Sequence, residues 1–141
     1  MTKAIQKTIS KPCHPKFLNE VRTLLNETLS DVPVSRREKD LIILAVDEAV
    51  SSLVQYARYK GFQNQITLSV DIDDVRFKAR VEDSLNVFEL ATGLNDTQLA
   101  EKVAREKGYT MGIFLIRQIM DEISYVYRKG FQNELELIKF L

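Results

Sequence analysis

A long amphipathic helix with clear start and stop signals is the feature that most constrains the fold of this chain. Ser35 and Glu38 have the spacing of a capping box, in which each side chain hydrogen-bonds the backbone amide of the other residue. The helical period then runs to Tyr59, and Gly61 is the expected left-handed residue that ends the helix. Aliphatic side chains recur along one face, which should pack on a sheet: Ile42, Ile43, Val46, Val50, Leu53, Val54 and Ala57.

Segments that alternate between apolar and polar residues follow this helix and predict strands. The first two are residues 65–71 and 75–81, and Asp73-Asp74 between them is typical of a hairpin turn. Further strands are predicted at 3–10, 123–127 and 135–140, and further helices at 15–30, 96–107 and 113–120. This order predicts an α/β (α+β) two-layer sandwich, in which helices cover one face of a mixed β-sheet.

The length of 141 residues indicates a single domain, 1–141, because domains commonly contain about 100–200 residues. One pentapeptide, Lys-Gly-Phe-Gln-Asn, occurs at 60–64 and again at 129–133, each time directly before a predicted strand. We interpret it as a turn-forming sequence that occurs twice, and not as the sign of a repeat architecture.

The charge balance and the cysteine content exclude several classes of protein. The 20 Lys and Arg residues equal the 20 Asp and Glu residues, whereas a nucleic-acid binder usually carries a basic excess, so no direct nucleic-acid binding is expected. The longest aliphatic run, 41–46, is far shorter than the ~20 residues that cross a bilayer, and the first residues lack an apolar signal core. Cys13 is the only cysteine, which rules out an intramolecular disulfide. We therefore expect a cytoplasmic protein that does not bind membranes.

Three places in the sequence could carry chemistry. Glu48, Ser52 and Tyr56 form one stripe of the long helix, Asp83 ends a predicted strand, and the segment 108–112 places two glycines before an apolar helix. Each has an ordinary structural explanation when it is taken alone. Polar residues often line the solvated face of a helix, aspartate often ends a strand, and glycines often serve turns or packing.

Together, and in this order, the three places resemble the histidine-kinase-like (GHKL) ATPase superfamily. The resemblance rests on Leu-Ala-Val-Asp-Glu-Ala-Val at 44–50, on the strand-ending Asp83, and on the glycines at 108 and 112. The segment 112–122 is the most specific part of the resemblance. The resemblance as a whole extends over nearly the entire chain. Within the superfamily, the sequence is similar to the anti-sigma factor serine/threonine kinases of bacterial partner-switching systems, which have the Bergerat fold.

The resemblance implies roles for individual residues. ATP would lie between the helices and a lid, and Glu48 would be the general base that activates a serine hydroxyl of the protein substrate. Asp83 would accept the amino group of adenine. Gly108, Thr110 and Gly112 would belong to the loop that faces the phosphates. Such a site suits phosphoryl transfer, which depends mainly on positioning and on charge stabilisation.

The resemblance also implies partners: a sigma factor, an anti-anti-sigma protein of the STAS type, and a second copy of the chain in a homodimer. Two positions depart from the family pattern. Ser52 replaces the usual asparagine ligand of Mg²⁺, and Leu85 replaces a glycine beside the adenine. A serine hydroxyl can bind Mg²⁺, but its side chain is shorter, and a leucine side chain can fill space that the base needs. Three functions remain open: a kinase that uses ATP and Mg²⁺, a non-catalytic protein-binding module, and a nucleotide-binding switch without kinase activity.

Overall fold

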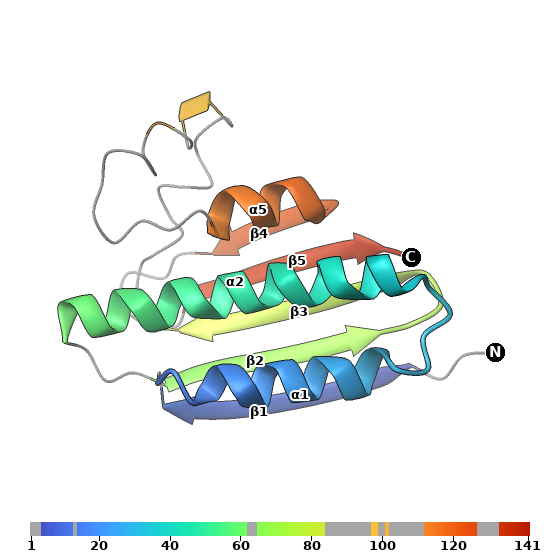
Figure 1. Ribbon diagram of the computed structural model, residues 1–141, viewed down its shortest axis with the longest axis horizontal. Coiled ribbons are helices and arrows are strands. Elements are labelled where there is room, and N and C mark those ends of the chain that lie inside the picture. Colours follow the sequence, from blue (N-terminus) through green and yellow to red (C-terminus); the bar gives the residue numbers. More distant parts are fainter. Residues whose placement is uncertain are drawn as a thin grey trace.

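The computed structural model describes residues 4–12, 14–61, 65–83, 97–98, 101, 112–126 and 133–141 (Figure 1). Its strands are β1 (Ile5–Pro12), β2 (Gln65–Ile72), β3 (Arg76–Asp83), β4 (Glu122–Val126) and β5 (Asn133–Phe140). Its helices include α1 (Phe17–Leu29), α2 (Arg36–Lys60) and α5 (Gly112–Ile119). Of the helices so described, none is long and apolar enough to cross a bilayer. Most of the helix expected at 96–107 lies outside the described residues.

The molecule has two layers, a five-stranded sheet and a layer of helices on one of its faces. The strand order is β1-β2-β3-β5-β4, and Figure 1 shows α1, α2 and α5 on the same side of the sheet, with α2 in the middle. Helix α2 packs against α1 on one flank and against α5 on the other. The two-layer sandwich that the sequence predicts is therefore confirmed.

The sheet is antiparallel at every pairing between the described strands, whereas the sequence predicts a mixed sheet. Two helices, α1 and α2, separate β1 from β2, so β2 returns alongside β1 in the opposite direction. Strands β3 and β4 run in the same direction, as a parallel pair would, but β5 lies between them and pairs with both. Only the insertion of β5 makes the sheet fully antiparallel, and a pattern read along the chain does not reveal that insertion.

The core lies between the sheet and the helices. Alternate residues of β2 and β3 are buried against the helix layer, as their period of two predicts: Ile66, Leu68, Val70, Ile72, Phe77, Ala79 and Val81. Helix α1 contributes a stripe at the expected helical spacing, formed by Phe17, Val21, Leu25, Thr28 and Leu29. These side chains pack between the helices and the sheet. Their packing positions the residues of the candidate site that α2 carries.

Both ends of α2 carry the signals that the sequence predicts, with one correction. The Ser35 hydroxyl accepts a hydrogen bond from the Glu38 amide at 3.1 Å, so the N-cap is formed. Within the described residues, Glu38 makes no return bond to the Ser35 amide, and its buried Oε2 has no hydrogen-bond partner. Only half of the capping box is present, because the Glu38 side chain turns inward. At the other end Gly61 adopts a φ of 74°, the left-handed conformation that glycine tolerates best.

Candidate functional site

Glu48 lies midway along α2, on a half-buried part of its surface. Burial raises the pKa of its carboxyl above the usual value, and the negative charge of Asp47 raises that pKa further, while Arg22 opposes both effects. A carboxylate with a raised pKa is a stronger base than an ordinary surface glutamate. The position therefore suits the general base that the resemblance implies.

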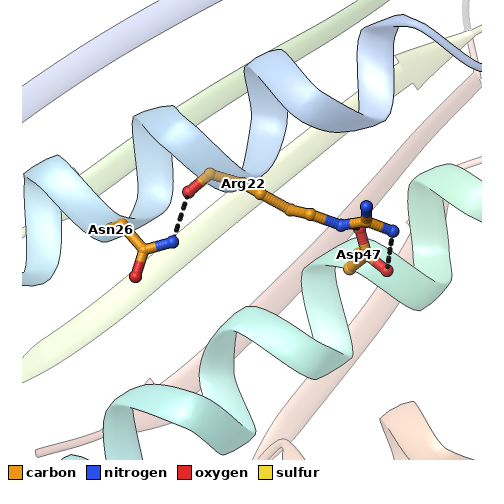
Figure 2. Close-up of polar contacts among 3 residues, drawn as sticks. All are labelled: Arg22, Asn26 and Asp47. Carbon is orange, nitrogen blue, oxygen red and sulfur yellow. Dashed lines mark hydrogen bonds and ion pairs between the residues drawn. The ribbon is translucent and has the colours of Figure 1, made fainter.

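An ion pair connects α1 and α2 directly beside Glu48. Arg22 Nε donates to Asp47 Oδ1 at 2.7 Å, and its Nη2 donates to Oδ2 at 3.2 Å, which makes the contact bidentate (Figure 2). This hydrogen bonding raises the pKa of the Arg22 guanidinium, and the charges of Asp47 and then Glu48 add to the effect. Bidentate pairs of this kind fix the orientation of both side chains. The sequence gives no sign of the pair, because 25 residues separate its two members.

Ser52 is buried, although the sequence predicts that it shares an exposed stripe with Glu48 and Tyr56. Its side chain is only 3% exposed, and its hydroxyl donates to the Glu48 carbonyl oxygen at 2.8 Å. Ala49 and Ala45, one and two turns earlier, are also fully buried. The buried face of α2 is wider than expected because α5 covers a second flank of the helix. The side chain of Tyr56 lies outside the described part of the structure.

A magnesium ion has few ligands to use among the described residues. Mg²⁺ prefers oxygen ligands in a near-octahedral arrangement, with carboxylates as the usual protein donors. No group of three or more His, Cys, Asp or Glu residues in the described ranges could hold a metal ion. The Ser52 hydroxyl is buried and its proton is engaged by a backbone carbonyl. Ser52 thus fits the role of a metal ligand poorly, and we derive no step through Mg²⁺.

Asp83 is the last residue of β3, and its side chain is 1% exposed. Asn133, the first residue of β5, lies directly opposite Asp83 in the strand pairing and is fully buried. A carboxylate and a side-chain amide thus share one buried place at the end of the sheet, and these two groups can accept and donate hydrogen bonds. Sequence reasoning missed Asn133. The available signal was the second copy of the repeated pentapeptide, whose last residue is this asparagine.

The first turn of α5 points to the same end of the sheet as Asp83. Helix α5 leads through Met120 into β4, which runs in the direction of β3, so α5 runs the opposite way and begins where β3 ends (Figure 1). Gly112 is its first residue, and a helix N-terminus favours anions. Leu85, Gly108, Thr110 and most of the lid, which the resemblance places at 89–107, fall outside the described residues.

Comparisons with known proteins agree with this arrangement. The family described as "Histidine kinase-like ATPase domain" matches residues 12–139. The serine-protein kinase RsbW of Listeria innocua serovar 6a is 26% identical over 127 residues, which cover 87% of this chain and 80% of the relative. The same kinase from Listeria monocytogenes serovar 1/2a is 28% identical over 129 residues, with the same coverage. A chain of the crystal structure of the SiaB–SiaC complex from Pseudomonas aeruginosa has the same fold, with a TM-score of 0.66 at 12% identity over 96% of this chain and 88% of that chain.

Proposed function

Because the chain belongs to the histidine kinase-like ATPase domain family, as its motifs predict, we propose that it is a nucleotide-dependent regulator of a bacterial partner-switching system. It binds an anti-anti-sigma protein of the STAS type and a sigma factor, and it phosphorylates a serine of the former with ATP. The observation that carries the proposal is the combination of a half-buried Glu48 with the buried Asp83–Asn133 pair in this fold.

The buried polar pair supports the nucleotide part of the proposal. The Asp83 carboxylate accepts a hydrogen bond from the exocyclic amino group of adenine, and the Asn133 amide lies opposite to contact the same edge of the base. The phosphates extend toward the first turn of α5, where the backbone amides that follow Gly112 offer donors to anions. Burial of both polar side chains strengthens their hydrogen bonds, since little water competes at this place.

Glu48 supports the chemical part. Its carboxylate takes the proton of the serine hydroxyl as the serine oxygen bonds to the γ-phosphorus of ATP, and the bond to the bridging oxygen breaks to release ADP. ATP supplies the phosphoryl group, and the chain supplies the base and the positioning. The raised pKa keeps Glu48 basic enough to share the proton in the transition state.

The relatives support the choice of protein partners. The names of the Listeria relatives describe serine-protein kinases, and the structural neighbour comes from a complex of two proteins. A chain with equal numbers of acidic and basic residues is suited to protein association rather than to a phosphate backbone. We further propose that the protein acts in the cytoplasm and as a homodimer, the assembly that the family resemblance implies.

Ser52 favours a second candidate, a regulator that binds partners without phosphorylating them. With its hydroxyl engaged by the Glu48 carbonyl, Ser52 offers a poor substitute for an asparagine ligand. Such a protein retains the fold and its partner surfaces. Its affinity for partners either depends on nucleotide binding without phosphoryl transfer or does not depend on nucleotide.

Titration with a fluorescent ATP analogue, with and without Mg²⁺, separates these functions. We expect micromolar nucleotide binding, and we expect Asp83→Asn to weaken it roughly tenfold or more, since a hydrogen bond to a charged group contributes about 1.5–3 kcal/mol. Binding that Mg²⁺ strengthens would support the kinase. Asp71→Asn on β2 makes the same chemical change away from the site and is the matched control. Binding that ignores Mg²⁺ would favour the switch without kinase activity. No binding at millimolar nucleotide would leave only the protein-binding module.

A further inference from the structure

We propose that the Arg22–Asp47 ion pair is the positioning element of Glu48: it ties α1 to α2 at the turn that carries Glu48 and sets the charge around its side chain. The proposal rests on the proposed role of Glu48 as the base. Neither Arg22 nor Asp47 contacts the nucleotide in this scheme, so both act through Glu48.

The geometry makes the pair rigid. Val21 and Leu25 anchor the turn of α1 on both sides of Arg22, and all of their surface is buried. Val46 anchors the turn of α2 that carries Asp47 in the same way. The guanidinium spans the two helices with two hydrogen bonds of 2.7 and 3.2 Å (Figure 2). The Arg22 side chain is 48% exposed, but that of Asp47 is only 15% exposed, and the bidentate contact orients it. Glu48 is the next residue on the same turn.

The surroundings of Glu48 contain charges of both signs. On α2 the neighbouring charge is Asp47, and on α1 it is Arg22. Helix α5 carries Arg117 as its one charged residue, and β3 carries Asp83 on the face that is turned toward the helices. Among these groups, Asp47 raises the pKa of Glu48 and Arg22 lowers it, after burial has raised it.

Arg22 and Asp47 therefore have opposite effects on the pKa of Glu48, although both belong to the same link between α1 and α2. Without Arg22, no cation would offset the negative charge of Asp47, and Glu48 would hold its proton to higher pH. Without Asp47, the guanidinium would be left with Glu48 as its carboxylate neighbour, and Glu48 would lose its proton at lower pH. Either loss removes the bidentate contact between α1 and α2.

Two variants test the inference, Arg22→Gln and Asp47→Asn. The pH titration of the Glu48 side-chain carboxyl, followed by carbon NMR on the full chain, is the first readout. We expect its midpoint to move to higher pH in Arg22→Gln and to lower pH in Asp47→Asn. The second readout is the pH profile of phosphoryl transfer, whose acid limb should move in the same two directions, with KM for ATP unchanged. Arg36→Gln and Asp40→Asn are the controls, since they break an exposed ion pair of 3.0 Å on the same helix and should move neither readout.

A shift of the Glu48 midpoint in the same direction in both variants, or in neither, would overturn the inference, because the pair would then not set the charge around Glu48. The proposed function fails separately. If the wild-type chain transfers no phosphate at any nucleotide concentration, the proposed kinase activity is refuted, yet the NMR titration still decides whether the ion pair controls the charge of Glu48.

Discussion

Substitution of Ser52 is the change for which the structure makes the sharpest prediction. Replacement by alanine removes the hydroxyl that donates to the Glu48 carbonyl oxygen at 2.8 Å. A hydrogen bond of this kind contributes about 0.5–1.5 kcal/mol, and the higher helix propensity of alanine returns about 0.5 kcal/mol, so the net loss should be about 0–1 kcal/mol. Replacement by the asparagine of the family pattern adds two heavy atoms at a position that is 3% exposed. Forcing extra atoms into a packed interior typically costs about 1–3 kcal/mol.

Urea unfolding followed by circular dichroism measures both variants on the same scale. We expect Ser52→Asn to be less stable than Ser52→Ala by about 1–3 kcal/mol, a difference of roughly 3 °C or more in Tm for a chain of this length. Repeating the measurement with saturating ATP and Mg²⁺ adds a functional test, because a ligand bound only by the folded state stabilises it. An asparagine variant as stable as the alanine variant would show that the space beside Ser52 is open, and our account of the buried face of α2 would be wrong.

Two further substitutions test the electrostatics and have opposite pH dependence. Glu48→Gln should stabilise the fold at pH 7, because the raised pKa of Glu48 means that the folded state binds its proton more tightly than the unfolded state does. Wild-type stability therefore falls as pH rises from 4.5 through the folded pKa. Thermal melts of the two proteins should converge below pH 4.5. The same variant should lose phosphoryl transfer, which a gel assay with labelled ATP would detect. Asp73→Asn should destabilise at pH 7, because bonds from the Val75 and Arg76 amides, at 2.8 and 2.9 Å, lower the pKa of Asp73 and favour its charged form. That deficit should shrink as pH falls below 3.8 through the folded pKa, and a constant deficit across the titration would refute the assignment.

Local signals predict most of the elements because each of them depends on neighbouring residues. Ser35 and Gly61 mark the two ends of α2, and Asp73 forms the turn between β2 and β3 with its own side chain, all as the sequence indicates. The alternation in β2 and β3 also identifies their buried faces correctly. These features are determined within a few residues of the chain, where pattern and propensity act directly.

Features that depend on distant segments were not predictable in the same way. Ser52 looks exposed on a helical wheel, but it is buried in the folded chain, in which α2 is packed on both flanks by α1 and α5. Asn133 becomes a candidate only when β5 pairs with β3 and places it opposite Asp83. Arg22 gains its role through a contact that spans two helices. The parts of the site at Leu85, Gly108 and Thr110 stay predictions, since they lie outside the described residues.

The position of β5 between β3 and β4 has a consequence for how the chain acquires its structure. During synthesis, β1, β2 and β3 can form a three-stranded sheet early, but β4 has no strand to pair with until residues 133–140 have emerged. The long-range pairing of β3 with β5 must therefore come late, after its loop-closure entropy has been overcome. The same event brings Asn133 to Asp83. The candidate nucleotide site therefore depends on the last strand of the chain, because β5 alone supplies the residue that lies opposite Asp83.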